Sequence, residues 1–214
     1  MDNNIDKNPW YKIPASDYEN HMDSPNVGQL KFLNNLFKDI LRKYNPGSLF
    51  VPGCTTGNGF EHVDFNITKK VLAVDINAEY IKILRERFQS NQDKIETVCT
   101  DLNNFDFSDR KFDLVHCALI FEYVNYELLL AKINSTLNIN GLMTVLLQLP
   151  HKSFPAVSDT NFSSLQSLEG FIRPLQSEEF KETAVSNGFQ CSSENIFTLK
   201  SDKTFWFGTF EKLP

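Results

Sequence analysis

Short apolar runs alternate with helical patterns along most of this 214-residue chain. The run KVLAVDI, residues 70–76, is apolar on both faces, which is typical of a strand covered on both sides in a parallel sheet. This alternation predicts a doubly wound α/β sheet. Further strands are expected at 48–51, 95–99, 112–117 and 142–149, and helices at 26–44, 57–65, 78–89 and 126–137.

The last third of the chain departs from this alternation. A helix is expected at 177–187, and two strand-like runs, 190–200 and 203–213, then follow with only a polar Ser-Asp pair between them. Because that pair suits a turn, the sheet is predicted to end in an antiparallel hairpin. Residues 31–214 are expected to form one domain, preceded at 1–30 by an N-terminal tail and a possible lid segment.

Composition limits the expected location and partners. Hydrophobic residues make up 41% of the chain and charged residues 22%, as in ordinary soluble globular proteins. No apolar run approaches the roughly 20 residues that cross a bilayer, and the polar, acidic start is unlike a secretory signal peptide. We therefore expect a cytoplasmic protein with no membrane partner. The net charge of −6, without a basic stripe in the sequence, argues against nucleic acid as a partner.

The cysteines do not suggest a metal site. Cys54, Cys99, Cys117 and Cys191 occur singly, with no C-x-x-C pair, so zinc is not expected. Because three of the four lie within or beside apolar runs, we expect free, reduced and largely buried thiols.

Three successive strand ends carry residues that suit a nucleoside. A loop of small residues, 53–57, follows the first expected strand, and Asp75 ends the second about 20 residues later. A carboxylate at that place accepts hydrogen bonds from both hydroxyls of a ribose. The third strand leads into Asp101 and Leu102, where a carboxylate beside a backbone N–H can bind the amino edge of adenine. Two simpler interpretations stay open: a tight turn at the loop, and Asp75 as the N-cap of the helix at 78–89.

These motifs resemble those of the class I S-adenosylmethionine-dependent methyltransferases, over about residues 30–214. VPGCTTG resembles the glycine-rich first motif of that family, VLAVDIN its acidic ribose motif and CTDLNNF its adenine motif. KFDLVHCALIFEYV is similar to the family's fourth strand, and RPLQSEEFKETAVSNGF to the helix before its closing hairpin. The resemblance implies a Rossmann-like sheet with a C-terminal antiparallel hairpin, S-adenosylmethionine as cofactor and S-adenosylhomocysteine as product. The implied cofactor contacts are Gly53, Cys54, Thr55, Thr56, Gly57, Asp75, Ile76, Asp101, Leu102, Cys117 and Ala118.

Two departures from the family pattern lie in the first motif. Val51 stands where the family often has an acid, which removes a water-mediated anchor for the methionine amino group, and Thr55 stands at the middle glycine. The glycine spacing also fails to match the G-x-G-x-x-G fingerprint of nicotinamide dinucleotide sites. No Asn/Asp-Pro-Pro-aromatic motif follows the fourth strand, so amino-methylating DNA enzymes are a poor match. With the acidic composition, this favours a small-molecule acceptor.

The acceptor is expected beyond the fourth and fifth strands. Methyl transfer mainly requires alignment of acceptor and methyl group, and a base only if the acceptor loses a proton early. The candidate bases are His151, otherwise a solvated loop histidine, and Glu122, otherwise a surface acid. His116 is interpreted as a packed core residue. The candidate acceptor-binding residues are Phe121, Tyr123, Gln148 and His21.

The segment at 10–22 is predicted to be a lid. It is rich in aromatic residues and has no clear place in the core, and Tyr18 and His21 would reach the methionine end of the cofactor or the acceptor. A static helix on the flank of the sheet and an interface with a second copy are the alternatives. The functional hypotheses are a methyltransferase acting on a small molecule and a non-catalytic or cofactor-binding partner protein. Aminopropyl transfer is a weaker third, because the additional acids of a polyamine pocket are not identified.

Overall fold

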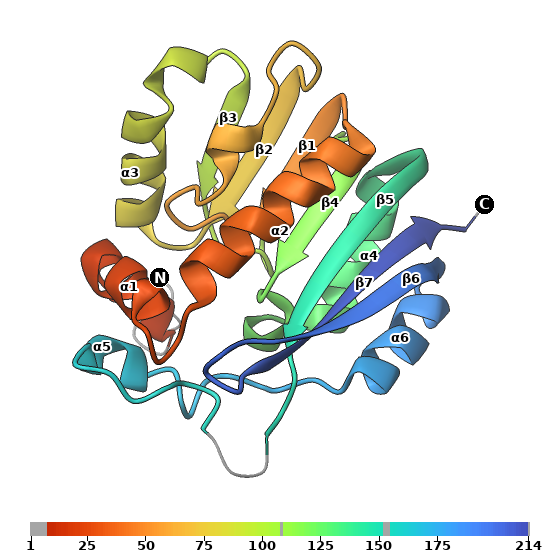
Figure 1. Cartoon of the computed structure of the whole chain (residues 1–214). Helices are drawn as coiled ribbons and strands as arrows, with labels where there is room; N and C mark the ends of the chain where they lie inside the picture. The colour runs from red at the N-terminus through yellow and green to blue at the C-terminus, as the bar shows by residue number, and fades with distance from the viewer. Residues whose placement is uncertain (1–7, 108, 152–154, 214) are drawn as a thin grey trace.

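The computed structural model describes residues 8–107, 109–151 and 155–213, and these form a seven-stranded sheet with helices on both faces (Figure 1). The strand order is β3-β2-β1-β4-β5-β7-β6. Strands β1 to β5 are parallel, and β7 lies antiparallel between β5 and β6. The predicted α/β sheet with its closing hairpin is confirmed. The strands are β1 Ser48–Pro52, β2 Lys70–Asp75, β3 Ile95–Cys99, β4 Phe112–Ala118, β5 Leu137–Gln148, β6 Phe189–Thr198 and β7 Thr204–Lys212.

Two pairs of helices cover the sheet. Helices α2 and α3 pack on one face, and α4 and α6 on the other (Figure 1). Strand residues alternate between the faces: Leu49 and Val51 of β1 point toward α2 and α3, whereas Phe50 points toward α4 and α6. The α-helices are α1 Ala15–Asp23, α2 Gln29–Tyr44, α3 Ala78–Arg87, α4 Tyr126–Thr136, α5 Ser163–Gln166 and α6 Ser177–Ser186, and the 3₁₀ turns are Pro9–Tyr11, Phe60–His62, Gln89–Asn91 and Phe121–Tyr123.

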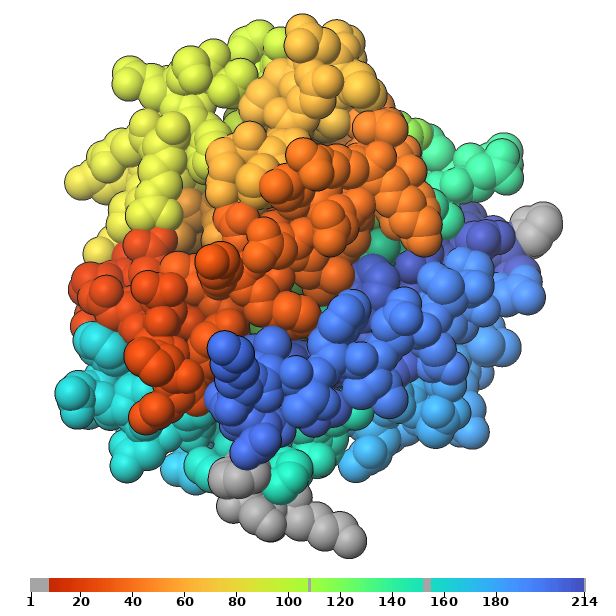
Figure 2. All heavy atoms as spheres, viewed as in Figure 1, coloured from red at the N-terminus to blue at the C-terminus, as the bar shows by residue number. Residues whose placement is uncertain are grey.

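Helices α1 and α5 form a separate layer beyond the carboxyl ends of the parallel strands (Figure 1). Its apolar residues form a third apolar core, in addition to the two on the faces of the sheet, and it is called here the roof cluster. Figure 2 shows the N-terminal helices, the α5 segment and the tip of the β6–β7 hairpin meeting on one face. A hydrogen bond from Ser201 Oγ to the Val27 carbonyl oxygen joins that tip to the start of α2. The buried residues of the roof cluster are Ile13, Ala15, Tyr18, Met22, Val27, Tyr80, Val157, Leu165 and Leu168.

Two expected elements differ from the structure by more than a few terminal residues. The helix expected at 57–65 is only a 3₁₀ turn, Phe60–His62. Gly57 and Gly59 have φ values of 84° and 90°, and residues in this left-handed region cannot propagate a right-handed helix. Strand β5 begins at Leu137, earlier than expected, because Leu137 pairs with Phe112 before an irregularity in the ladder.

The conformation of Gly57 leads to a stability prediction. A Cβ atom there would lie 2.9 Å from Phe88 Cε2 and 3.1 Å from Leu84 Cγ. Gly28 also has a positive φ, but a Cβ atom there would meet nothing within 4 Å. We expect Gly57→Ala to lower the free energy of unfolding by about 1–2 kcal/mol more than Gly28→Ala, because only Gly57 adds overpacking to backbone strain. Urea unfolding of both variants measures the difference, and equal losses would contradict the crowding seen around Gly57.

The cysteines are only partly as expected. All four thiols are free, and Cys54 and Cys117 are buried. Cys99 is exposed and Cys191 is half-buried, so the expectation of burial was wrong for these two. Both lie on the outermost strands of the sheet, β3 and β6, which have a neighbouring strand on one side only.

Residues 1–7 of the predicted N-terminal tail fall outside the described residues. Within the described ranges, the helices are all too short or too polar to cross a membrane.

Candidate active site

A cavity lies at the carboxyl ends of the parallel strands, beneath the roof cluster. Residues from β1, β2, β4 and β5 and from the turns that follow these strands line it, as expected for ligands in open α/β sheets. Thirteen of the sequence-predicted site residues meet there: Tyr18, His21, Gly53, Cys54, Thr55, Asp75, Ile76, Asp101, Leu102, Ala118, Glu122, Tyr123 and Gln148.

The loop after β1 is held against β2 by its own backbone. The N–H groups of Gly53 and Cys54 donate to the carbonyl oxygen of Val74, and the Thr55 N–H donates to Asp75 Oδ2 at 2.9 Å. Thr55 has a φ of 47°, a left-handed conformation that favours glycine. Thr55, at the position of the middle glycine in the resembled motif, is therefore held in the glycine-type conformation, and it lines the cavity.

Asp75 is buried at the end of β2. Its Oδ1 accepts the N–H of Asn77 at 2.9 Å, and Oδ2 accepts that of Thr55, so each oxygen retains a lone pair for a ligand hydroxyl. Burial raises the pKa of Asp75 to about 6. The residue that caps α3 is Asn77, whose side-chain oxygen accepts the N–H groups of Glu79 and Tyr80. Asp75 is therefore not the helix cap that the sequence left open.

The end of β3 completes this half of the cavity, called here the cofactor half after the contacts that the family resemblance implies. Asp101 accepts hydrogen bonds from the backbone and side-chain nitrogens of Asn103, which fix its carboxylate beside the cavity. Leu102 is buried, and with Ile76 it provides apolar wall between Asp75 and Asp101. The loop after β1, Asp75 and Asp101 thus line one continuous surface.

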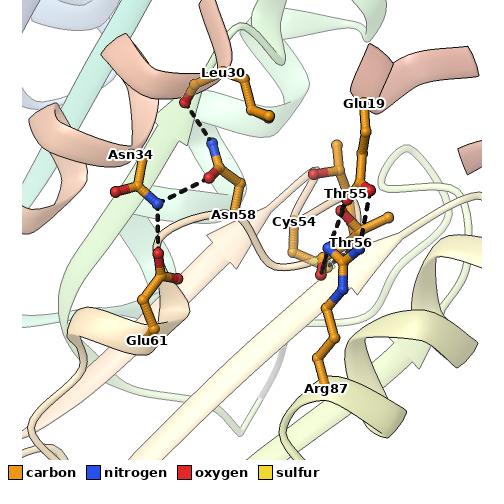
Figure 3. A network of polar contacts seen from close by, with 9 residues as sticks. All are labelled: Glu19, Leu30, Asn34, Cys54, Thr55, Thr56, Asn58, Glu61 and Arg87. Atoms are coloured by element: carbon orange, nitrogen blue, oxygen red, sulfur yellow. Dashed lines mark hydrogen bonds and ion pairs between the residues drawn. The ribbon is translucent and has the colours of Figure 1, made fainter. Parts of the chain in front are cut away.

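Polar contacts clamp the glycine loop between the first two helices (Figure 3). On the α1 side, Arg87 donates from its two terminal guanidinium nitrogens to the carboxylate of Glu19, and the Thr56 hydroxyl donates to the same carboxylate. On the α2 side, Asn58 donates to the Leu30 carbonyl oxygen. The Glu19–Arg87 pair connects α1 to α3 over the loop, so displacement of α1 would break it.

Aromatic side chains line the roof of the cavity. The rings of Trp10 and Tyr123 meet edge to face with centroids 5.1 Å apart, and those of Tyr18 and Tyr80 lie 5.5 Å apart. Burial raises the pKa of the Tyr18 hydroxyl to about 12. The Asn77 side chain donates to the carbonyl oxygens of Trp10 and Ile13, which ties the N-terminal segment to the end of β2.

The other half of the cavity, called here the acceptor half after the position expected for the acceptor, lies beyond β4 and β5. Glu122 follows β4 and is buried, and its Oε1 accepts the backbone N–H of Gln148 at 2.9 Å. Its Oε2 is also buried and has no hydrogen-bond partner within the described residues. Burial raises the pKa of Glu122 to about 7. A carboxyl group that is half-ionised near neutral pH and has a free oxygen is suited to accept a proton.

A lysine that the sequence reading missed completes the acceptor half. Lys203 lies just before β7, and only 8% of its surface is exposed. Its Nζ donates to the Ala156 carbonyl oxygen at 2.8 Å and to Gln148 Oε1 at 3.4 Å. Burial lowers the pKa of Lys203 to about 8. Gln148 thus joins Glu122 and Lys203 through its backbone and its side chain.

The two buried histidines of the cavity have environments that do not favour a role as a general base. His116 stacks on Phe37 with centroids 4.5 Å apart, and its Nδ1 contacts Thr144 Oγ1, as a packed core histidine does. Burial lowers the pKa of His116 to about 3. His21 Nδ1 contacts Thr160 Oγ1, and burial, aided by the charge of Lys203, lowers the pKa of His21 to about 4.

Five sequence-predicted residues do not line this cavity. His151 is exposed and lines a smaller cavity, which shares Gln148, Ala156, Ile172 and Lys203 with the main one. Cys117 and Phe121 point into the core shared with α4 and α6. The Thr56 hydroxyl donates a hydrogen bond to the Glu19 carboxylate, and Gly57 packs against α3. Lys203 was missed because a lysine at a hairpin turn is ordinarily exposed. The sequence around Lys203 contains no pattern that indicates burial.

The position of α1 bears on the lid hypothesis. Tyr18, His21 and Met22 are buried over the cavity, and not on the flank of the sheet.

If the segment at 10–22 opens to admit ligand, S-adenosylhomocysteine should slow amide exchange and proteolysis there. Glu19→Gln should raise exchange of α1 about 2- to 5-fold in the free protein by weakening the pair with Arg87. Lys82→Gln, which alters an exposed pair on α3, should not. Equal protection with and without ligand would reject a mobile lid.

The comparisons with known proteins agree with this geometry. The model of a methyltransferase domain matches residues 52–141, from the end of β1 to the middle of β5. An uncharacterized protein of Methanocaldococcus jannaschii is 33% identical over 135 residues, which are 58% of this chain and 54% of that protein. The match therefore spans about half the length of that relative.

Among the similar solved structures, two match nearly the whole chain. The N-methyltransferase NodS of Bradyrhizobium japonicum, in complex with S-adenosylhomocysteine, has a TM-score of 0.67 and 13% identity, and the match covers 96% of this chain and 98% of that one. The 1,6-didemethyltoxoflavin N1-methyltransferase of Burkholderia thailandensis, with bound 1,6-didemethyltoxoflavin and S-adenosylhomocysteine, has a TM-score of 0.66 and 16% identity over 94% of this chain and 87% of that one. At these identities the likeness concerns the fold.

Proposed function

We propose that this chain, a class I S-adenosylmethionine-dependent methyltransferase by its matched domain and its fold, transfers a methyl group to a small-molecule acceptor. The family expected from the sequence is thereby confirmed. The observation that carries the proposed function is one cavity with two unlike halves, in which Asp75 and Asp101 line one half and Glu122 and Gln148 the other.

The residues of the cofactor half fit S-adenosylmethionine. The Asp75 carboxylate has free lone pairs for the ribose hydroxyls, and Asp101 lies where the adenine amino edge would meet a carboxylate. Ile76 and Leu102 provide apolar surface for the adenine ring, and the fixed backbone at Thr55 faces the methionine part. When bound, the cofactor supplies a methyl group on an activated sulfonium.

The protein's part in the reaction is alignment, exclusion of water and acceptance of a proton. The roof cluster and the Trp10–Tyr123 pair cover the cavity, which keeps solvent from the acceptor. Gln148 holds Glu122 through its backbone N–H, and Glu122 Oε2 takes the proton that a hydroxyl or amine acceptor releases. His151 stays a weaker candidate for the base, because it lies in the smaller cavity.

Calorimetry and turnover test the proposed function. Purified protein is titrated with S-adenosylhomocysteine and then incubated with S-adenosylmethionine and a panel of small metabolites, and S-adenosylhomocysteine formation is measured. Binding together with acceptor-dependent turnover supports the enzyme. Binding without turnover on any acceptor would favour a cofactor-binding partner protein, and absence of binding a scaffold that does not use the cofactor.

A further inference from the structure

The acceptor half contains a buried cation without a buried counter-ion. Within the described residues, no carboxylate lies within 4 Å of Lys203 Nζ, and its hydrogen-bond acceptors are the neutral oxygens of Ala156 and Gln148. A lysine ammonium has three donors, so this pair of contacts leaves one N–H free. Placing an ammonium in a protein interior costs several kcal/mol unless an opposite charge compensates it.

The surroundings of Lys203 do not supply that charge. His21 is close enough for the lysine charge to disfavour its protonation, and it is neutral because burial keeps its pKa near 4. Asp202 also lines the smaller cavity, but it is exposed and makes no ion pair with Lys203. Gln148 lies between Glu122 and Lys203 in the network of contacts. Lys203 faces both the main cavity and the smaller cavity beside His151. Its free donor is therefore available to a bound molecule.

We infer that the acceptor carries an anionic group, a carboxylate or a phosphate, and that Lys203 binds this group while Glu122 faces the atom that receives the methyl group. This inference rests on the proposed function for the identity of the cavity as an acceptor site. An anion would pair with Lys203 in a site from which water is largely excluded, where such contacts are strong. The same cation disfavours a polyamine, which weighs against aminopropyl transfer.

Anionic and neutral aromatic probes test the inference, and benzamide is the uncharged counterpart of benzoate. The full chain, saturated with S-adenosylhomocysteine, is titrated calorimetrically with benzoate, phenyl phosphate and the uncharged benzamide. We expect at least one anion to bind about 10- to 100-fold more tightly than benzamide. The anion that binds more tightly indicates whether the natural group is a carboxylate or a phosphate.

Two variants assign the preference to Lys203. Lys203→Met keeps an unbranched side chain one atom shorter and removes the charge, and it should abolish the preference for the anion. Lys200→Met, which alters an exposed lysine in the same hairpin turn, should leave the preference unchanged. A wild-type protein that binds neither anion more tightly than benzamide, or binds none of the three probes, overturns the inference. A preference that survives in Lys203→Met also overturns it.

The experiments distinguish failure of the proposed function from failure of the anion site. Loss of S-adenosylhomocysteine binding would count against the cofactor site alone, and the probe titrations are therefore repeated without S-adenosylhomocysteine. An anion preference that depends on Lys203 in both series supports the anion site whatever the cofactor result.

Discussion

Glu122→Gln is expected to lower the rate of methyl transfer by about 10²- to 10⁴-fold, the usual contribution of a general base. Glutamine has nearly the same shape, and its side-chain oxygen can still accept the Gln148 N–H, so the packing around residue 122 should persist. S-adenosylhomocysteine affinity should be unchanged, because Glu122 lies in the acceptor half. Glu127→Gln, at an exposed acid on α4, serves as the control and should retain wild-type turnover.

The pH dependence of turnover should identify the base. Because the pKa of Glu122 is about 7, kcat/KM of the wild-type protein should fall as pH decreases below about 7 and Glu122 becomes protonated. The glutamine variant should lack this titration. Wild-type turnover and an unchanged pH profile in Glu122→Gln would show that Glu122 is not the base.

Stability offers an independent check on the burial of Glu122. The folded pKa of about 7 exceeds the ordinary value of 4.5, so between these pH values the folded state binds a proton that the unfolded state has lost. The contribution of Glu122 to stability is therefore full below pH 4.5 and is lost as pH rises toward 7. At pH 8, Glu122→Gln should be more stable than the wild type by up to about 3 kcal/mol in urea unfolding. Asp75 titrates in both proteins, so the difference between them isolates Glu122.

The sheet could be predicted because its strands carry their burial in the sequence. The run at 70–76 is apolar on both faces, and this is the pattern of a central strand between two helical layers. The hairpin could be predicted from the Ser-Asp pair between two strand-like runs. The expected helix at 57–65 failed because the helical pattern does not reveal that Gly57 and Gly59 adopt positive φ values.

The candidate site could also be predicted only in part. Residues at strand ends, such as Asp75 and Asp101, could be placed because parallel strands bring their carboxyl ends to one edge of the sheet. The acceptor half depends on contacts between distant segments: Lys203 of the hairpin reaches Ala156 and Gln148. Burial of a lysine of this kind follows from tertiary packing, for which a single sequence contains no periodic signal.

Asp75→Ala is expected to weaken S-adenosylhomocysteine binding by roughly 10- to 150-fold. The carboxylate would accept hydrogen bonds from the ribose, and hydrogen bonds to a charged group contribute about 1.5–3 kcal/mol. Asp75 also accepts the N–H groups of Thr55 and Asn77, so its removal perturbs the loop as well as the ribose contact. A control must therefore remove a carboxylate with a similar structural role.

Asp113 provides that control at the opposite end of the sheet. It accepts the backbone N–H of Ser48 at 2.8 Å and a side-chain N–H of Asn138, and it lies outside the cavity. Asp113→Ala should lower stability but leave S-adenosylhomocysteine affinity unchanged. In the wild type, affinity should also fall below about pH 6, because protonation of Asp75 removes the charge that strengthens the ribose contact. If a folded Asp75→Ala protein binds as tightly as Asp113→Ala, Asp75 only organises the loop, and the ribose must be held by other residues.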